Sequence, residues 1–314
     1  LIIPDGILFN LSFDLLTTDP ISNYRELSSK SLLARHDITY HYSLFMAGLQ
    51  QAEDTLDLNY VAFAPGFSDE LKKEYASSVR DSMKLDKQYL SLLPQPNTSK
   101  LVRKFKTLLG GETYMDRAST PAEFRKNAGG HKIIHIGTHA EYNNINPERS
   151  RLIFAKTPVT TTDTNSLFLY DIYNCNVNSD LTLLTACETG RPGYQDGEGM
   201  VSLAHAFNYA GSRSILTGLW KIDEQSSTQI TEAFMQHLKE GLPSDEALRK
   251  AKLDYLSGNP DRLLAPAYWS GLVLMGKPGI IRFEDPGINP WWWALGGSVM
   301  LALIFFLYRR RKRA

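Results

Sequence analysis

Short apolar segments with the character of buried strands recur along the chain, separated by polar or glycine-rich turns. They are rich in β-branched and aromatic residues, and apolar residues follow one another without regular alternation. This pattern is typical of strands that are buried on both faces of a parallel sheet. The sequence predicts such strands at Asn59–Ala64, Lys132–Ile136, Leu181–Thr185, Ser214–Trp220 and Tyr268–Met275.

Amphipathic segments fill the gaps between these strands, and their apolar residues recur at helical spacing. They predict helices at Ala122–Ala128, Gly199–Tyr209, Glu224–Glu240 and Ser244–Leu256, with Ser244 as an N-cap. Alternation of strands and helices predicts an α/β fold in which a mostly parallel sheet is flanked by helices. Residues 71–109 are polar and helical in character, and we expect them to connect an N-terminal lobe, residues 1–115, to a second lobe, residues 116–276.

The C-terminal end has a different pattern. Residues 277–290 are rich in proline and glycine and predict a linker, whereas residues 291–308 contain no charged side chain. As a helix, that uncharged segment would span about 27 Å, close to the hydrocarbon core of a bilayer. A tryptophan cluster opens it and a basic tail, residues 309–314, follows it, so it predicts a transmembrane helix rather than a buried core helix.

The basic tail also predicts the orientation of the protein in a membrane. The positive-inside rule places it in the cytoplasm and the globular part on the opposite side. That orientation requires an export signal upstream of Leu1, and we interpret the sequence as a fragment because it does not begin with methionine. The alternative is a tail-anchored protein whose globular part is cytoplasmic.

Composition narrows the classes of partner and cofactor. The 314 residues contain 34 basic and 34 acidic side chains, so a nucleic-acid partner has no electrostatic support. Two cysteines, Cys175 and Cys187, exclude a disulfide scaffold. The glycine-rich run Gly193–Gly199 lacks the Gly-Lys-Ser/Thr ending of a phosphate loop, so we expect no nucleotide or other cofactor.

A histidine and a cysteine follow two of the predicted strands. His139 comes just after Lys132–Ile136, and Cys187 just after Leu181–Thr185. Because the carboxyl ends of parallel strands meet at one edge of a sheet, we expect both side chains to lie there. An imidazole beside a thiol takes its proton and stabilises the thiolate, so the pair predicts nucleophilic catalysis. The alternative for Cys187 is a buried structural thiol.

The spacing of His131, His135 and His139 suggests a metal site on one face of a helix, but the surrounding isoleucines favour a strand. In a strand, two histidines that are four residues apart in sequence are separated by roughly 13 Å, which is too far for both to bind one ion. We therefore expect no metal site, and we interpret His135 as a packed core residue and His139 as the base.

With these residues in place, the chain resembles the CHAT domain family, the caspase-like and separase-like cysteine peptidases of clan CD, over nearly all of residues 1–276. The matching segments follow one another in the family's order: Ile3–Leu8, Ile38–Tyr40, Phe63–Pro65, His135–His139, Ser150–Leu152, Leu184–Gly190, Asp196–Gly199, Leu219–Trp220 and Tyr268–Gly271.

The resemblance implies a cysteine endopeptidase with Cys187 as nucleophile and His139 as general base, acting on a protein or peptide. It also implies an oxyanion hole formed by the backbone N–H groups of Cys187 and the residue after the histidine, here Ala140 where relatives usually have glycine. Many members are joined to tetratricopeptide repeats. The alternative is therefore a non-enzymatic or partner-activated interaction scaffold, coupled to such a repeat region upstream or to a regulatory protein.

Acidic residues near the predicted strand ends suggest a pocket for a basic P1 side chain. Asp223 is the first candidate, followed by Asp196 and Glu198. The alternative is a scaffolding role, in which Glu224 opens the following helix and Asp196 and Glu198 organise the glycine-rich turn.

Overall fold

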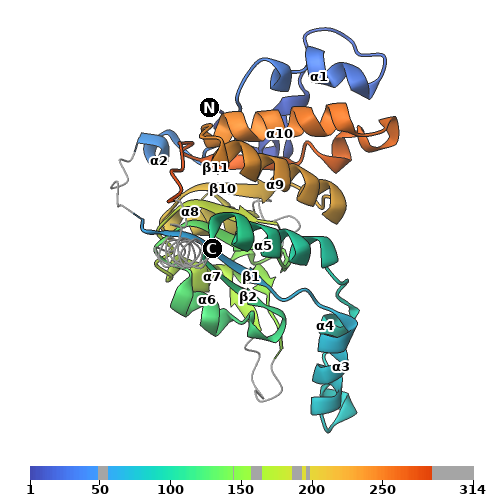
Figure 1. Ribbon diagram of the computed structural model, residues 1–314, viewed down its shortest axis with the longest axis vertical. Coiled ribbons are helices and arrows are strands. Elements are labelled where there is room, and N and C mark those ends of the chain that lie inside the picture. Colours follow the sequence, from blue (N-terminus) through green and yellow to red (C-terminus); the bar gives the residue numbers. More distant parts are fainter. Residues whose placement is uncertain (49–55, 144, 157–164, 186–192, 196–198, 285–314) are drawn as a thin grey trace, which may run out of the picture. The chain divides into compact units, whose positions relative to one another are not determined.

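The centre of the fold is a six-stranded sheet with the strand order β11-β10-β7-β3-β1-β2 (Figure 1). Neighbouring strands are parallel, except that β11 is antiparallel to β10. The computed structural model describes residues 1–48, 56–143, 145–156, 165–185, 193–195 and 199–284. The strands of the sheet are β1 (Leu58–Ala64), β2 (Glu112–Met115), β3 (His131–Ile136), β7 (Ser179–Leu184), β10 (Ser212–Gly218) and β11 (Leu272–Gly276).

This sheet confirms the predicted α/β fold with a mostly parallel sheet. Four of the predicted strands coincide with β1, β3, β7 and β10 apart from their ends. The fifth was predicted to begin too early, because Pro266–Tyr268 form a 3₁₀ helix and β11 begins only at Leu272. The edge strand β2 was not predicted, since it is short and carries polar, partly exposed residues.

Helices cover both faces of the sheet, which explains why its strands are almost continuously apolar. On one face, α5 (Pro96–Leu109), α9 (Glu224–Lys239) and α10 (Ser244–Gly258) share a core with the residues of the sheet that point to that side, such as Tyr60 and Ala62 of β1. On the other face, α6 (Pro121–Asn127), α7 (Leu169–Tyr173) and α8 (Leu203–Tyr209) share a second core with the intervening residues, such as Val61 and Phe63 of β1.

Two helix starts differ from the sequence-based prediction. Gly199–Val201 form a strand, β9, that pairs with β8 (Gly193–Gln195), so α8 begins only at Leu203, with Ser202 as its N-cap. Ser244 is the first residue of α10 rather than its N-cap, because its hydroxyl accepts a hydrogen bond from the backbone N–H of Gly279 at 3.2 Å.

The remaining elements lie around this framework. A small antiparallel sheet consists of β4 (His139–Glu141), β5 (Arg151–Ile153) and β6 (Ser166–Phe168). Helices α3 (Asp69–Ser78) and α4 (Lys87–Ser91) form an arm, residues 69–91, that projects from the carboxyl edge of the main sheet (Figure 1). The short elements are η1 (Gly6–Asn10), η2 (Phe13–Leu15), η3 (Tyr24–Glu26), α1 (Leu27–Lys30), η4 (Leu32–Ala34), α2 (Leu44–Gly48), η5 (Ser82–Lys84), η6 (Asp116–Ala118), η7 (Pro147–Arg149), η8 (Asp261–Leu263) and η9 (Pro266–Tyr268).

The N-terminal segment is built into the same body as the rest. The backbone N–H of Tyr40 donates to the carbonyl of Leu274 in β11, and that of Gly276 donates to Tyr40. Both predicted lobes, residues 1–115 and 116–276, contribute strands to the same sheet, in which β1 and β2 lie beside β3. Residues 1–283 form one compact unit.

The first part of the predicted linker belongs to this unit as well. Ile281 is 4% exposed within the core, and Gly279 exchanges hydrogen bonds with Ser244. The predicted transmembrane helix, residues 291–308, and the basic tail, residues 309–314, lie outside the described residues. Within the described ranges, none of the helices has the length and apolar character needed to cross a bilayer.

A buried ion pair joins α10 to the N-terminal segment. Lys252 donates a hydrogen bond to the carboxylate of Asp14, and the two side chains are only 2% and 4% exposed. The hydroxyl of Ser12 lies 3.5 Å from the same carboxylate. Neither charge has much contact with water, so each depends on the other for compensation.

We predict that Lys252→Met lowers the free energy of unfolding by about 3–5 kcal/mol, because it leaves the Asp14 carboxylate buried without a counter-charge. Urea denaturation measures this change. Adding Asp14→Leu to Lys252→Met should recover most of the loss, since no uncompensated charge then remains. Lys250→Met is the matched control: its partner Glu246 is at the surface, and it should cost less than about 1 kcal/mol. Equal losses for both lysine variants would contradict the prediction.

Candidate functional site

The ends of β3 and β7 meet at the carboxyl edge of the main sheet. Ile136 lies opposite Leu184 in the parallel register, and the backbone N–H of Thr185 donates to the carbonyl of Ile136 at 3.1 Å. His139 is the first residue of β4 and lies three positions after the last residue of β3, beyond Gly137 and Thr138. Cys187 lies outside the described residues, which end on this side at Thr185. The structure therefore describes the histidine half of the predicted pair and the strand that leads to the cysteine.

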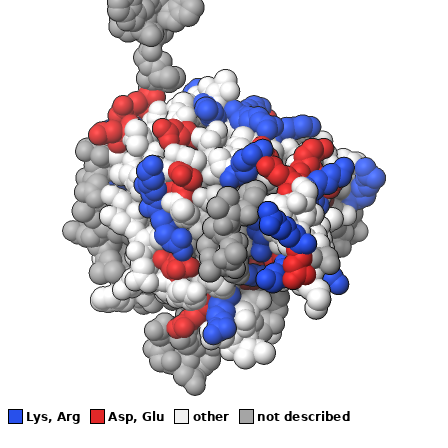
Figure 2. Space-filling model, turned by 90° about the horizontal axis from the view of Figure 1, so that it is seen from below, with Lys and Arg blue, Asp and Glu red and all other residues white. Residues whose placement is uncertain are grey.

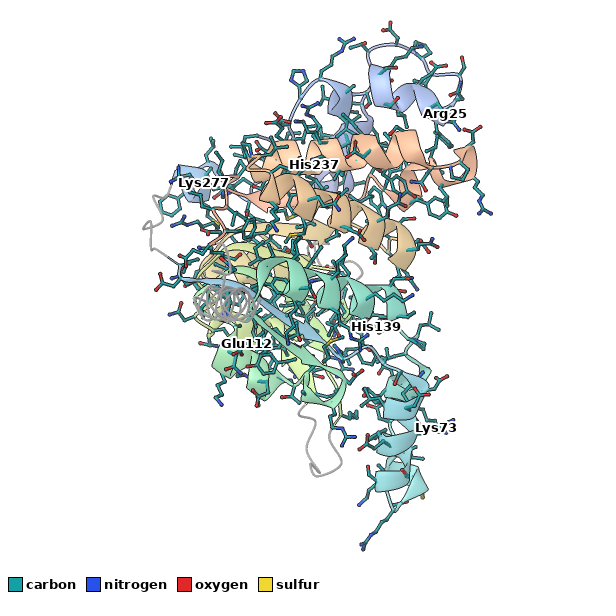
Figure 3. The ribbon with its side chains drawn as sticks, in the orientation of Figure 1. Arg25, Lys73, Glu112, His139, His237 and Lys277 are labelled. Carbon is teal, nitrogen blue, oxygen red and sulfur yellow. The ribbon has the colours of Figure 1, made fainter. Side chains whose placement is uncertain are left out.

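The imidazole of His139 lies where the sheet meets the arm of α3 and α4 (Figure 3). Its Nε2 lies 2.8 Å from the backbone carbonyl oxygen of Leu93, and its ring packs against that of Phe67 with centroids 5.0 Å apart. A carbonyl oxygen can only accept, so Nε2 carries the hydrogen and Nδ1 carries the lone pair. Burial lowers the pKa of His139, so near neutral pH the ring is uncharged and Nδ1 can take a proton.

Close packing explains the glycine between the strand and this histidine. A Cβ atom on Gly137 would lie 2.3 Å from Cγ2 of Thr98, in the first turns of α5. The next residue, Thr138, donates its hydroxyl hydrogen to the carbonyl of Ile153 in β5. The segment His135–His139 is thus held between α5 and the small sheet, and this directs the chain into β4.

His135 is a core residue, as predicted, and not a second base. It is fully buried, with Nδ1 2.9 Å from the Tyr60 hydroxyl and Nε2 2.9 Å from Oγ1 of Thr185. Burial lowers the pKa of His135 to about 3, so this ring is uncharged throughout the physiological range. Nδ1 of His131 instead lies 3.1 Å from the carbonyl of Gly129. The three histidines that suggested a metal site thus each have separate partners.

The structure describes some of the predicted pocket and oxyanion residues but not others. Asp223 is the N-cap of α9, and its Oδ2 accepts hydrogen bonds from the backbone N–H of Ser226 at 2.9 Å and from its hydroxyl at 3.1 Å. Ala140 lies in the middle of β4 opposite Leu152, with its side chain against the core. Asp196 and Glu198 lie outside the described residues. Of the acidic pocket candidates, the structure describes only Asp223, and it has a scaffolding role there.

Glu224 also has a scaffolding role, but a longer-range one than opening its own helix. Its carboxylate accepts a hydrogen bond from the backbone N–H of Thr98 at 2.9 Å and another from Nδ2 of Asn97 at 3.3 Å. Both donors lie in the first turn of α5, where a negative charge is favourable. Glu224 thereby ties α9 to α5 beside His139.

Sequence reasoning missed several residues that hold His139 in place. Leu93 and Phe67 contact its ring, and Gln95 donates through its backbone N–H to Gly66 and through Nε2 to the carbonyl of Thr138. Leu93 accepts a hydrogen bond through its own backbone carbonyl, and Gln95 donates to the backbone carbonyls of other residues. Such contacts leave no recognisable side-chain pattern in a sequence.

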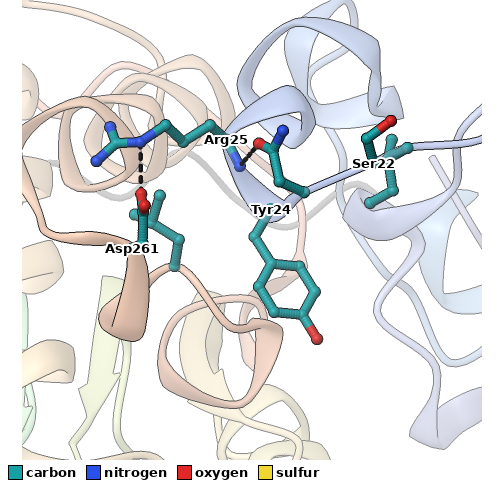
Figure 4. Close-up of a pocket in the computed structure, with 7 residues that line it drawn as sticks. Ser22, Tyr24, Arg25 and Asp261 are labelled. Carbon is teal, nitrogen blue, oxygen red and sulfur yellow. Dashed lines mark hydrogen bonds and ion pairs between the residues drawn. The ribbon is translucent and has the colours of Figure 1, made fainter.

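A hollow of about 450 Å³ lies elsewhere on the domain, between residues 21–25 and 261–264 (Figure 4). Its main polar interaction is the ion pair between Nε of Arg25 and Asp261, 2.5 Å apart and mostly exposed. Of the predicted catalytic and pocket residues that the structure describes, neither His139 nor Asp223 lines it. On the face shown in Figure 2, basic and acidic side chains are interspersed over the described residues, in keeping with the absence of net charge.

The environment of His139 predicts how it titrates. We expect a pKa below 6.5 and a neutral form protonated on Nε2, because burial disfavours the charged ring and the Leu93 carbonyl selects the tautomer. Nitrogen-15 NMR of the histidine side chains as a function of pH measures both. His237 is an internal control. Partial burial lowers its pKa, but hydrogen bonds with Asp254 and Glu240 raise it, and the net shift is upward. His237 should therefore titrate above 6.5. A His139 that titrates above His237 would contradict the assignment.

Comparisons with solved structures find partial likeness at low sequence identity. The separase–securin complex of Saccharomyces cerevisiae aligns with 80% of this chain and 15% of the matched chain, at 12% identity and a TM-score of 0.46. The complex of the RgpB pro- and mature domains of Porphyromonas gingivalis aligns with 74% of this chain and 50% of that chain, at 11% identity and a TM-score of 0.42.

Comparisons of sequence give a more definite result. Tetratricopeptide repeat protein 28 of Mus musculus is 26% identical over 116 residues, which is 37% of this chain and 4% of that protein. The chain thus spans only a small fraction of the length of this relative. The family model described as the CHAT domain matches residues 1–277, which is almost the whole of the compact unit. The chain therefore belongs to the CHAT domain family.

Proposed function

We propose that this protein is a cysteine endopeptidase in which Cys187 and His139 form a catalytic dyad. The observation that carries the proposal is the register of β3 and β7, since His139 and Cys187 each follow the end of one of these adjacent strands. The neutral imidazole of His139, with its lone pair on Nδ1, supplies the base that a thiol needs. Family membership and the retention of both residues are in keeping with this chemistry.

The proposed reaction proceeds in two stages. His139 takes the thiol proton of Cys187, and the thiolate attacks the scissile carbonyl carbon to form a tetrahedral intermediate. The imidazolium then protonates the leaving amine, which leaves an acyl-enzyme that water hydrolyses with His139 again as base. The backbone N–H groups of Ala140 and Cys187 would stabilise the oxyanion, a contribution of about 3–4 kcal/mol for each well-placed donor.

The proposed substrate is a protein or peptide, and we retain a preference for a basic P1 side chain as part of the proposal. Asp223 caps α9 through Oδ2, so contact with a substrate cation would fall to Oδ1 of this exposed residue. Asp196 and Glu198 are the other candidates for that pocket.

The proposal includes a membrane anchor. Residues 291–308 have the length and composition of a membrane-spanning helix, and the basic residues 309–314 favour a cytoplasmic tail. The peptidase domain would then lie on the non-cytoplasmic side, or in the cytoplasm if the protein is tail-anchored.

A second candidate function is an interaction scaffold, or a peptidase that is silent until a partner binds. It is favoured by the sequence similarity to a protein named for its tetratricopeptide repeats, since repeat arrays commonly bind partners on extended surfaces. The experiment below distinguishes the two functions.

We predict that peptide electrophiles with Arg or Lys at P1 label the protein on Cys187, and that His139→Ala slows labelling by about 10²–10⁴-fold through loss of the base. Mass spectrometry of the full chain after labelling measures both. Cys187→Ala should abolish labelling. Cys175→Ala is the matched control and should label like the wild type, because burial raises the pKa of the Cys175 thiol and its Sγ donates to the carbonyl of Asp171.

Undiminished labelling of Cys187→Ala would overturn the proposed nucleophile. If a folded wild-type protein reacts with no probe in a panel that also carries Asp, Met or Leu at P1, the scaffold or partner-activated function is favoured instead.

A further inference from the structure

Lys156, three positions after the last residue of β5, is enclosed by the arm of α3 and α4. Its Nζ lies 5.5 Å from the ring centre of Tyr75 and 5.7 Å from that of Tyr89, and 2.9 Å from Oδ2 of Asp86. Its backbone N–H donates to the Tyr89 hydroxyl at 3.2 Å. The side chain is only 17% exposed, so its charge acts in a partly dehydrated site, where ion pairs and cation–π contacts are stronger than at an open surface.

The partners of Lys156 also hold the arm together. The backbone N–H of Asp86 donates to the Tyr75 hydroxyl at 3.1 Å, and Oδ1 of Asp86 caps α4 through the N–H of Tyr89 at 2.9 Å. The rings of Tyr75 and Tyr89 pack edge to face, with centroids 5.2 Å apart. One lysine from the body of the domain thus contacts α3, α4 and the connection between them.

The residues that flank the arm, Phe67 and Leu93, supply both contacts described above for the His139 imidazole. Phe67 lies just before α3 and packs against His139 on one side and against Tyr89, 5.9 Å away, on the other. Leu93 lies just after α4, and its carbonyl accepts the Nε2–H of His139. Phe67 has a φ of +48°, which a bulky residue adopts only where its surroundings hold it. The packing that Tyr89 provides therefore helps to hold Phe67 in this conformation.

We propose that Lys156 is a positioning residue that acts through the arm on His139. By holding Asp86, Tyr75 and Tyr89, it fixes the arm so that the Leu93 carbonyl and the Phe67 ring keep His139 in one tautomer and one orientation. Its catalytic consequence rests on the proposed dyad, but its effect on the imidazole does not.

A second contact between the arm and the body of the domain is weaker than that of Lys156. Gln88 of α4 donates to the carboxylate of Glu141 in β4, but this contact lies at the surface, where such interactions contribute little. Lys156 is thus the more effective link between arm and body. A partner that bound the arm and separated it from Lys156 would also displace His139, so the arm is a route by which a bound partner would lower activity.

The test compares Lys156→Met with Lys156→Arg in the full chain. Methionine keeps the apolar stem between the two rings but removes the charge, whereas arginine keeps the cation and can still bind Asp86 and stack on tyrosine. Lys104→Met is the matched control, because Lys104 pairs with Glu232 at the exposed surface. Nitrogen-15 NMR reports the tautomer and pKa of His139, which a His139→Gln sample assigns, and a peptide electrophile reports the inactivation of Cys187.

In the wild type, Lys156→Arg and Lys104→Met, we expect the Nε2–H tautomer. In Lys156→Met we expect a mixture of tautomers and a His139 pKa that moves up toward 6.5, because the ring becomes more hydrated. The maximal rate of Cys187 labelling should fall about 10–100-fold with the probe's affinity unchanged, since a displaced base costs rate rather than binding.

An unchanged tautomer and pKa in Lys156→Met would overturn the proposal, whether or not the protein labels. A changed tautomer in a protein that never labels would support the positioning role and count against the peptidase. If Lys156→Met fails to fold, Asp86→Asn serves in its place. It keeps the cap of α4 but weakens the ion pair, and it should change His139 in the same direction by a smaller amount.

Discussion

Parallel pairing of β3 with β7 is the constraint on which the rest of the candidate site depends. Side chains beyond the ends of two parallel neighbours face the same edge, whatever sequence separates the strands. The pairing requires that both faces of the sheet be buried, and α5, α9 and α10 on one side and α6, α7 and α8 on the other provide that burial. The parallel sheet covered on both faces thus accounts both for the apolar core and for the position of the candidate site at its carboxyl edge.

Much of this arrangement was predictable because its signals are local. The strand runs at β1, β3, β7 and β10 are apolar on both faces, and His139 lies three positions after the last residue of β3. The same local logic failed where tertiary contacts decided the structure. Ser244 looks like an N-cap, yet it binds Gly279 from a segment that reads as a linker. β1 and β2, which come from residues 1–115, complete the sheet that carries β3, and no local pattern indicates this long-range pairing.

The surroundings of His139 were not predictable for a different reason. The arm of α3 and α4 reads as a polar helical connector, and its contribution to the site is a carbonyl group of Leu93 and a strained Phe67. A backbone carbonyl is present at every position and therefore carries no sequence signal. Only the fold shows that Phe67 and Leu93, which flank residues 69–91 and are far from β3 and β7 in sequence, contact the candidate base.

The buried chain of Tyr60, His135 and Thr185 has a thermodynamic consequence for the domain as a whole. His135 titrates near 6.5 in an unfolded chain and at about 3 in the folded one, so between these values only the unfolded state binds the proton. Folding stability therefore falls as the pH drops below about 6.5, by up to about 1.4 kcal/mol for each pH unit from this one residue. The histidine that joins the strand before His139 to the strand before Cys187 thus sets an acid limit on the compartments in which the domain can stay folded.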